Sequence, residues 1–353
     1  MRVMSVVGAR PQFIKLAPVD RALRASGHEH IIVHTGQHYS PELSSALFAD
    51  LAIPEADVNL NVGSGGHAEQ TAGMLVGLEI VFGENPVDWI LAYGDTNSTL
   101  AAALAAVKLG RPIAHLEAGL RSGNRRMPEE HNRVVTDHVA DLLLAPTETG
   151  MRHLAEEGLA DRSILVGDVM ADVCLRVRAA TDRQPPQMPA AWSDDDPPVL
   201  ATLHRAENTD DPARLAMLIE RLAAMPFPVM LVAHPRLVSK ADAAGIELEH
   251  GALRVGASLT YSQMVYATAR ARGVVTDSGG LQKEAFLLRT PCITARTETE
   301  WPETLSDDWN IIDPDLTADP AAQFARERPE RRDHPFGEGD AAERTVRALA
   351  DGL

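Results

Sequence analysis

The fold of this chain is decided by the stretch GVVTDSGGLQKEAFL, residues 273–287. Its apolar start, 273–276, predicts a short buried strand, and 281–287 predicts a helix. The Ser-Gly-Gly turn at 278–280 would leave backbone N–H groups open at the start of that helix, where the helix dipole favours an anion. Glu284, one turn inside the helix, can accept hydrogen bonds from both hydroxyls of a ribose. The alternative is a tight strand-to-helix turn whose glycines serve the backbone geometry alone.

The same alternation of strand and helix runs along the rest of the chain. Apolar runs that alternate with amphipathic stretches of about 10–15 residues predict βαβ units and parallel sheets covered by helices on both faces. The predicted strands cover 3–7, 30–34, 89–93, 113–116, 142–145, 164–166, 199–203, 229–232, 273–276 and 292–295. The predicted helices cover 14–25, 42–51, 68–81, 100–108, 130–140, 148–156, 212–225, 260–270, 281–287 and 341–353.

The length of 353 residues predicts two domains. The segment 181–198 contains five prolines and an acidic run, and is typical of a linker or a long surface loop. We therefore expect an α/β protein with one Rossmann-like domain over 1–170 and a second over 171–340. The helix over 341–353 is expected to pack back on the first domain.

The composition argues against several classes of protein. Lys plus Arg number 33 and Asp plus Glu 50, and the net charge of −17 repels nucleic acid and anionic membranes. A phosphorylated ligand therefore needs a local cluster of cations. No uncharged apolar run of 18 residues is present, and the first strand is too short for a signal sequence. Cys174 and Cys292 are far apart and build neither a disulfide framework nor a metal cluster, so we expect a cytoplasmic protein.

Polar residues that follow strands are the candidate site residues, because ligands of open parallel sheets bind at the carboxyl ends of the strands. The first strand runs into GARPQFIK, residues 8–15. Arg10 at the strand end and Lys15 in the following helix can both meet a phosphate. The alternative is two solvated cations beside a loop. The dinucleotide fingerprint GxGxxG is absent there, so nothing indicates a nicotinamide cofactor.

Three acidic residues share one predicted rim, and we refer to Asp95, Glu117 and Glu129 as the rim acids. The first two follow neighbouring strands, the third opens a helix, and Arg121 and Arg133 can orient them. Several carboxylates in one site suit proton transfer at carbon, because burial and like charge raise their pKa values towards neutrality. The alternatives are structural, with Asp95 as a helix cap and the acids that open the helix placed favourably at its N-terminus.

The second half of the chain offers a matching set of cations. His204 and Arg205 follow its first strand and could hold a phosphate, with His204 also available as a proton donor. His234 follows the next strand and is a weaker candidate. Together with the Ser-Gly-Gly turn, they indicate a nucleoside diphosphate bound by the second domain, with its sugar facing the rim acids. His34 and His38 have no third ligand, so no metal site is predicted.

Six motifs, in this order and near these spacings, resemble the non-hydrolysing UDP-N-acetylglucosamine 2-epimerase family. They are GARPQFIK (8–15), GDTNSTL (94–100), HLEAGLRSG (115–123), MPEEHNR (127–133), LHRAEN (203–208) and TDSGGLQKEA (276–285). The resemblance covers residues 2 to about 313, although TDSGG by itself recurs among sugar-nucleotide glycosyltransferases. It implies a GT-B architecture with the active site in the cleft between two Rossmann-like domains. It also implies a homodimer that needs no metal, NAD or other cofactor.

The reaction implied by the resemblance interconverts UDP-GlcNAc and UDP-ManNAc. The C2 proton of the sugar is removed while UDP leaves C1, and the resulting 2-acetamidoglucal is reprotonated at C2 as UDP adds again. Products of this family enter surface polysaccharides, lipopolysaccharide and some antibiotic sugars. The resemblance implies that the rim acids, His204 and Lys15 carry out the acid/base chemistry and that Arg133 supports them. It also implies that UDP is bound by Arg10, His204, Arg205, His234, Ser278, Gly279, Gly280 and Glu284.

Two departures from the family pattern leave alternatives open. The segment QHYSPE at 37–42, together with His67 and Glu69, differs where allosterically regulated bacterial members bind a second UDP-GlcNAc, which argues against activation by substrate. LHRAENTDD, PCITAR and ETEWPE look more like the branch with epimerases of UDP-2,3-diacetamido-glucuronic acid, so the groups at C3 and C6 of the substrate stay open. A hydrolysing 2-epimerase that releases ManNAc and UDP, a GT-B glycosyltransferase and a UDP-sugar sensor are the other candidates.

Overall fold

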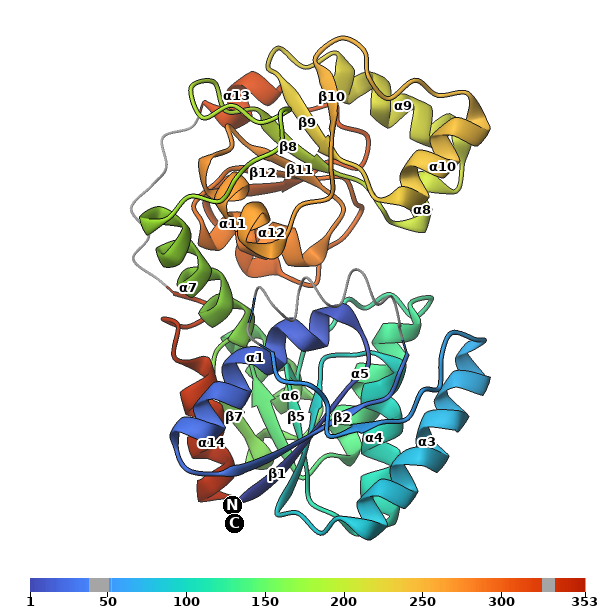
Figure 1. The fold of residues 1–353 in the computed structure, drawn as a ribbon, viewed down its shortest axis with the longest axis vertical. Helices are drawn as coiled ribbons and strands as arrows, with labels where there is room; N and C mark the ends of the chain where they lie inside the picture. The colour runs from blue at the N-terminus through green and yellow to red at the C-terminus, as the bar shows by residue number, and fades with distance from the viewer. Residues whose placement is uncertain (38–50, 52, 326–333, 353) are drawn as a thin grey trace. The chain divides into compact units, whose positions relative to one another are not determined.

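The chain forms two α/β units, unit 1 from Met1–Val173 with Asp333–Leu353 and unit 2 from Cys174–Arg332 (Figure 1). The computed structural model describes residues 1–37, 51, 53–325 and 334–352. Each unit contains one parallel sheet with flanking helices, which confirms the predicted fold class. The predicted helix over 42–51 lies outside the described residues except for Leu51. In the described part of the chain, no helix is long and apolar enough to cross a membrane.

Unit 1 is built on a seven-stranded sheet in the order β3-β2-β1-β4-β5-β6-β7. All neighbouring strands are parallel, so each crossover carries a helix or a long loop back over the sheet. The strands are β1 (Arg2–Val7), β2 (Glu29–His34), β3 (Val58–Asn59), β4 (Trp89–Tyr93), β5 (Ile113–Leu116), β6 (Leu142–Ala145) and β7 (Ser163–Leu165). The helices are α1 (Arg10–Ala25), α3 (His67–Glu84), α4 (Asn97–Lys108), α5 (Pro128–Val139), α6 (Glu148–Glu156), η1 (Ala160–Arg162), α7 (Val169–Arg183), which runs on into unit 2, and α14 (Ala341–Asp351).

The central strands of unit 1 are apolar because helices cover both faces of the sheet. Met4 and Val6 of β1 pack in one core with Met74 of α3 and the alanines of α4, whose small side chains let that helix lie close to the sheet. Ser5 faces the other side, where its hydroxyl lies 2.7 Å from Tyr93 Oη and 2.7 Å from His30 Nε2. The alternation along β1 therefore places α3 and α4 on one face and α1 on the other.

Helix α14 completes unit 1 from the far end of the sequence. It packs beside α1 (Figure 1), and Trp89 Nε1 of β4 donates to the carbonyl of Leu349 at 2.9 Å. The carboxylate of Asp172 accepts from the first N–H groups of α14, those of Ala341 at 3.1 Å and Ala342 at 2.8 Å. The C-terminal helix thus belongs to the same unit as the first strand.

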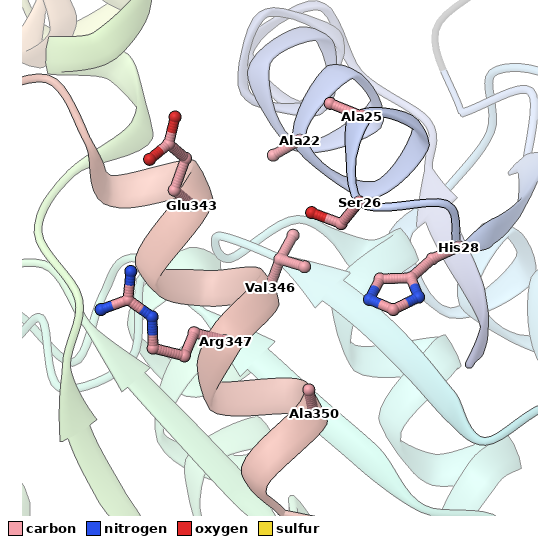
Figure 2. A pocket seen from close by; sticks show the side chains of 8 residues that line it. All are labelled: Ala22, Ala25, Ser26, His28, Glu343, Val346, Arg347 and Ala350. Atoms are coloured by element: carbon pink, nitrogen blue, oxygen red, sulfur yellow. The ribbon is translucent and has the colours of Figure 1, made fainter.

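An open pocket of about 330 Å³ lies between the end of α1 and α14, and Figure 2 shows the side chains that line it. It is lined by Ala22, Ala25, Ser26, His28, Glu343, Val346, Arg347 and Ala350. Because α1 starts at the carboxyl end of β1 and runs back along the sheet, its last turn lies at the amino ends of the strands. Ligands of such sheets bind at the opposite end, so this pocket is not the predicted site.

Unit 2 has a six-stranded parallel sheet in the order β10-β9-β8-β11-β12-β13. Its strands are β8 (Val199–Thr202), β9 (Val229–Val232), β10 (Leu253–Gly256), β11 (Val274–Thr276), β12 (Cys292–Thr294) and β13 (Asn310–Ile312). The helices are α8 (Ala206–Thr209), α9 (Pro212–Ala223), α10 (Pro235–Ala244), α11 (Tyr261–Arg270), α12 (Gly279–Leu287), η2 (Pro302–Asp308) and α13 (Pro320–Phe324).

The proline-rich segment predicted as a linker or surface loop is packed on unit 2. Helix α7 extends to Arg183, and the irregular residues that follow are tied down by side chains. Trp192 stacks edge-on against Tyr266 of α11, and Tyr266 Oη donates to Asp194 at 3.0 Å. Arg272 also reaches Asp196 at 2.9 Å. Beyond Arg183 the segment contains no helix or strand, and it is fixed to unit 2, so it is a packed surface loop and not a free linker.

Candidate active site

Both sheets reverse the direction of their strand order at one point, between β1 and β4 in unit 1 and between β8 and β11 in unit 2. Ligands of open parallel sheets bind outside the carboxyl ends of the strands at such a point. The predicted residues Lys15 and Asp95 follow β1 and β4, and His204 and Ser278 follow β8 and β11. In each unit, the topology therefore gathers the predicted site residues where a ligand would bind.

Lys15 and Glu117 form a buried ion pair in unit 1, with Lys15 Nζ bonded to Glu117 Oε2. Burial by itself lowers the pKa of Lys15, but the charges of Glu117 and Asp95 outweigh it and raise that pKa above its usual value. Lys15 is therefore a fixed cation. A Cβ atom on Gly94 would lie 3.0 Å from Lys15 Nζ and 3.1 Å from Glu117 Oε2, so position 94 requires a glycine. Glu117 has a φ of 78°, a strained value of the kind that clusters at functional sites.

Asp95 is held by a buried cation while part of its own side chain remains exposed. Arg133 Nη2 bonds to Asp95 Oδ2, and Arg133 Nη1 donates to Glu130 Oε2 at 2.6 Å. The N-cap position of α4 is occupied by Thr96, so Asp95 does not play the structural role of a helix cap. Asp95 is thus oriented by the buried Arg133, while the rest of its carboxylate remains accessible to solvent.

The two acids that open α5 differ in their surroundings. Glu130 is buried and accepts from the backbone N–H groups of Ser122 at 3.0 Å and Gly123 at 2.9 Å. Burial alone raises the pKa of Glu130, but these bonds and Arg133 hold it below its usual value. Glu129, the predicted rim acid, is exposed to solvent in the first turn. Glu130 therefore anchors a loop, whereas Glu129 is accessible to a ligand.

His115 and Asp137 form a completely buried histidine–aspartate pair beside the rim acids. His115 Nδ1 lies 2.6 Å from Asp137 Oδ1, and its Nε2 lies 2.6 Å from the carbonyl oxygen of Gly94. Arg121 was expected to orient the rim acids, and that expectation is wrong. Its guanidinium donates to Asp137 at 2.7 Å and, through two bonds of 2.8 Å, to Glu157. Sequence reasoning missed Asp137, which carries no sequence signal beyond its place on α5.

The loop after β1 is held to the end of β4 by one buried side chain, that of Gln12. Its Oε1 accepts from the N–H groups of Gly8 at 2.8 Å and Ala9 at 3.0 Å, while its Nε2 donates to the carbonyl of Tyr93 at 2.8 Å. This arrangement places the start of α1, where Arg10 lies, beside the Gly94 turn. The side chain of Arg10 is not among the described parts, so its predicted phosphate contact stays a prediction.

Asp277 organises the candidate site in unit 2. This fully buried carboxylate accepts from the backbone N–H groups of His204 and Arg205, each at 3.0 Å, and from Asn208 Nδ2 at 3.1 Å. His204 Nδ1 lies 3.0 Å from its Oδ1. Burial alone raises the pKa of Asp277, but the bonds from His204 and its neighbours hold it below its usual value. Because a carboxylate only accepts, Nδ1 of His204 carries the proton and Nε2 is left for a ligand.

The predicted strand–turn–helix around Ser278 is present. Ser278 is the N-cap of α12, and its Oγ accepts from the N–H of Leu281 at 3.4 Å. Gly279 and Gly280 open the helix, so their N–H groups belong to the first turn, which has no partners inside the helix. Glu284 lies within α12 and is buried.

Sequence reasoning missed a buried charged cluster beside the start of α12. Arg296 donates two bonds to Glu300, at 2.8 and 2.9 Å; although burial opposes it, this pairing lowers the pKa of Glu300 to about 2. Lys283 Nζ lies 3.8 Å from the ring centroid of Trp301. A Cβ on Gly279 would lie 3.5 Å from Glu300 Oε2 and 3.6 Å from Trp301 Nε1. The signal that could have found this cluster is its place in the sequence, because it follows strand β12 in the same way that the other candidate residues follow a strand.

The remaining candidates of unit 2 have local roles. His234 is the N-cap of α10, where its Nδ1 accepts from the N–H of Arg236 at 3.2 Å, and its side chain is exposed. Arg205 Nε donates to the carbonyl of Asp277 at 3.0 Å, and its Nη2 lies 3.9 Å from Glu300. The guanidinium of Arg205 is thus positioned, while the histidine at 234 is an exposed cap.

The region that departs from the regulated bacterial members is partly visible. Asn97 Nδ2 donates to Gln70 Oε1 at 2.9 Å and lies 3.2 Å from His67 Nδ1. Gln70 Nε2 in turn donates to the carbonyl of Gln37 at 3.1 Å. Residues 38–42 and the histidine at 38 lie outside the described residues. No group of three or more His, Cys, Asp or Glu side chains able to hold a metal ion occurs in the ranges that the structure describes.

Comparison with known proteins places the chain in a family. The family model for UDP-N-acetylglucosamine 2-epimerase matches residues 21–350. A "UDP-N-acetylglucosamine 2-epimerase homolog" of Methanococcus maripaludis is 40% identical over 99% of both chains. A "UDP-2,3-diacetamido-2,3-dideoxy-D-glucuronate 2-epimerase" of Pseudomonas aeruginosa is 43% identical over 88% of both.

A solved structure shares the whole fold. It is the UDP-GlcNAc 2-epimerase of Methanocaldococcus jannaschii in complex with UDP-GlcNAc and UDP, which is 35% identical over 99% of this chain and 100% of that chain, with a TM-score of 0.88. Such structural neighbours have the GT-B type of fold, and the predicted resemblance is confirmed. The chain belongs to the UDP-N-acetylglucosamine 2-epimerase family, a family of sugar-nucleotide epimerases.

Proposed function

We propose that the chain inverts C2 of a UDP-2-acetamido sugar by eliminating UDP and adding it again, and that the sugar nucleotide, not free sugar, is the product. The observation that carries this proposal is the pair of carboxylates at the strand reversal of unit 1, Asp95 and Glu117. Each is paired with one buried cation, Arg133 or Lys15. Each cation fixes the position of its carboxylate, and a carboxylate held in one place can act as a general acid or base.

In the first half of the reaction, a carboxylate takes the C2 proton, the C1–O bond breaks and its electron pair leaves with UDP. The C2 electron pair forms the C1=C2 bond of 2-acetamidoglucal. In the second half, an acid delivers a proton to the other face of C2 while a UDP oxygen bonds again to C1. The rim acids supply the base and the acid, because removal and return on opposite faces call for two groups. Glu129 is the accessible third member of that set.

Departure of UDP lowers the barrier only where the developing diphosphate charge is stabilised. In unit 2, His204 is oriented by Asp277 through Nδ1, so its Nε2 is the atom we assign to the diphosphate. The first N–H groups of α12, at Gly279 and Gly280, take a second phosphate oxygen. Glu284 takes the ribose hydroxyls, and Arg10, Arg205 and His234 remain predicted UDP contacts.

A second substrate is favoured by one observation. The Pseudomonas relative named for UDP-2,3-diacetamido-2,3-dideoxy-D-glucuronate is 43% identical, against 36% for the Methanocaldococcus UDP-GlcNAc 2-epimerase. The C2 chemistry is the same for both sugars, and only the groups at C3 and C6 differ. Both sugars therefore belong in the same experiment.

The test is NMR of the chain with each sugar nucleotide in deuterated water. The proposal predicts a C2-epimeric UDP-sugar with deuterium at C2. Free ManNAc with UDP would identify a hydrolysing enzyme, and an acceptor-dependent loss of UDP-sugar would identify a glycosyltransferase; either result contradicts the proposal. The faster of the two sugars is the substrate.

We also propose that the chain forms a homodimer through unit 1. Val76 and Ile80 of α3 are 60% and 57% exposed, and further exposed apolar side chains lie at Val107 of α4 and Val135 of α5. Burial of such side chains against a second copy removes apolar area from water. Light scattering should show a dimer that Ile80→Glu converts to a monomer. Glu79→Lys, on the same helix, is the control that keeps the dimer.

The expected cytoplasmic location stays a proposal. Cys174 and Cys292 are both buried and neither takes part in a disulfide, as suits a compartment that keeps thiols reduced. Fractionation of the producing cell tests the assignment, and recovery of the chain outside the cytoplasm would contradict it.

A further inference from the structure

The ring of His115 lies between two groups that accept hydrogen bonds. Its Nε2 is 2.6 Å from the carbonyl oxygen of Gly94, and its Nδ1 is 2.6 Å from Asp137 Oδ1. A backbone carbonyl never donates, so the proton of that short bond sits on Nε2. The state of the ring then depends on whether Asp137 is ionised.

Two partners besides His115 indicate that Asp137 is a carboxylate. Arg121 donates to its Oδ2 at 2.7 Å, and so does the N–H of Gly119 at 3.1 Å. An ionised Asp137 can only accept, so Nδ1 of His115 also carries a proton. The ring is therefore a buried imidazolium that donates in both directions.

The backbone groups held by this pair belong to the two loops that carry rim acids. The carbonyl of Gly94, which His115 binds, immediately precedes Asp95, and the N–H of Gly94 donates to the carbonyl of Leu116 at 3.0 Å. The N–H of Gly119, which Asp137 binds, lies two residues after Glu117. One histidine–aspartate pair thus fixes the turn before one rim acid and the turn after the other.

We propose that His115, held doubly protonated by Asp137, is a positioning residue that sets the geometry of Asp95 and Glu117 for proton transfer at C2. This inference rests on the proposed function for its kinetic consequence, but not for the protonation state of the ring. The restraint acts through the backbone. Glu117 has a strained φ, and the Lys15–Glu117 pair lies close against the backbone of Gly94, so a shift of either turn would move this pair. His115 need not touch the substrate.

The protonation state is tested by NMR of the wild-type chain labelled with ¹⁵N-histidine. Two ring N–H signals that vanish together in His115→Gln are expected. In Asp137→Asn one signal should vanish and the other, bonded to Gly94, should remain. A single ring N–H for His115 in the wild-type chain would overturn the assignment. This readout involves no substrate, so it stands or falls separately from the proposed function.

The positioning role is tested by kinetics with the sugar nucleotide that the chain turns over. His115→Gln is expected to lower kcat more than tenfold while KM and the affinity for UDP stay within twofold of wild type. Asp137→Asn is expected to lower kcat at least threefold with the same constancy of KM, which keeps the test available if the first variant does not fold. A kcat within error of wild type in the folded variants would overturn the proposal. So would equal changes of kcat and UDP affinity, which indicate general damage.

A matched control is available in the same unit. His30 and Asp20 form another buried pair, with His30 Nδ1 2.7 Å from Asp20 Oδ1, but His30 Nε2 meets the hydroxyl of Ser5, not a site backbone group. Asp20→Asn should therefore leave kcat within twofold of wild type. A loss as large as that of Asp137→Asn would show that any buried pair in unit 1 matters equally, and would overturn the specific role of His115.

Discussion

Two histidine–aspartate pairs, one in each unit, use the same contact for different ends. In both, the carboxylate is 0% exposed and Nδ1 of the ring faces it, but the ring of His115 is 0% exposed and that of His204 is 49% exposed. Nε2 of the buried His115 ring bonds to the carbonyl of Gly94. The ring of His204 is exposed, and we propose that its Nε2 meets a ligand. We therefore propose that the buried pair shapes the site, and that the exposed pair meets the ligand.

We propose that unit 1 carries out the proton transfer and that unit 2 binds the nucleotide. Glu117→Gln is the strongest test of that division. Loss of a general acid or base costs typically about 10²–10⁴-fold in rate. We expect kcat to fall by about that factor because glutamine cannot take the C2 proton. Deuterium exchange into the UDP-sugar measures the loss. Calorimetry should give an unchanged UDP affinity, and a large change there would refute the division between the units.

The carboxylates of the two histidine–aspartate pairs, Asp137 and Asp277, should differ in what they contribute to the stability of the fold. Breaking a fully buried pair by removing one charge costs about 3–5 kcal/mol, which is the expected cost of Asp137→Asn. Asp277→Asn should cost less, about 1.5–3 kcal/mol, because its histidine is half exposed and hydrogen bonds to charged groups are of that size. Urea denaturation followed by circular dichroism measures both. The reverse order of costs would contradict the role given to burial.

A double-mutant cycle sharpens the role of His204. If His204 acts as the residue that Asp277 orients, then His204→Ala, Asp277→Asn and the double variant should each lower kcat by a similar factor of about 100, because removing either member disables the pair. Additive losses of about 10⁴ in the double variant would mean that the two residues act separately. Arg178→Ala, which breaks an exposed ion pair with Asp182 in the same unit, should leave kcat unchanged.

Asp172 is a half-buried carboxylate with no cation among its partners in the described part of the chain. Its contribution to stability should change with pH in the sense opposite to that of Asp137 and Asp277. Burial raises the pKa of Asp172 to about 6 although two N–H groups of α14 bond to it. Between about pH 4 and pH 6 the folded chain keeps a proton that the unfolded chain has lost, so stability falls as the pH rises through this window. Asp172→Asn should then be more stable than wild type above pH 6, by about 1–3 kcal/mol.

The same Asp172→Asn gain should disappear towards pH 4, where the wild-type side chain is protonated in both states. Thermal unfolding at pH 4 and pH 8 is the measurement. By contrast, the stability contributed by Asp137 and Asp277, whose pKa values are lowered, is present at neutral pH and is lost only as the pH falls below about 4. A gain in stability of the Asp172 variant that did not depend on pH would contradict the predicted direction of this pH dependence.

The strand and helix pattern was predictable because hydrophobic periodicity fixes local structure, and the central strands are continuous apolar runs. Strands β10 and β13 and helix α10 were not predicted. Leu253–Gly256 and Asn310–Ile312 are edge strands of only four and three residues, which is too short to show an alternating pattern or a continuous apolar run. Edge strands are determined by pairing more than by their own sequence.

The candidate site was predictable to the extent that its residues follow strands. Asp95, Glu117, His204 and Ser278 were all found by that rule. The residues that hold them were predictable only in part. Arg133 was expected to orient the rim acids and does bond to Asp95, whereas Asp137 and Arg296 become meaningful only when the fold brings them to His115 and Glu300. Arg121 was assigned to the wrong carboxylates for the same reason, because sequence distance does not show which of several nearby acids a guanidinium meets.

The central claim is that UDP leaves C1 during inversion at C2. Substrate labelled with ¹⁸O in the bridge between C1 and the β-phosphorus tests it directly, with ³¹P NMR following the label in recovered UDP-sugar. The account predicts that ¹⁸O moves from the bridge to non-bridging positions as deuterium from the solvent enters C2, since a released β-phosphate rotates before it bonds again. Deuterium at C2 with all of the ¹⁸O still in the bridge would contradict the account.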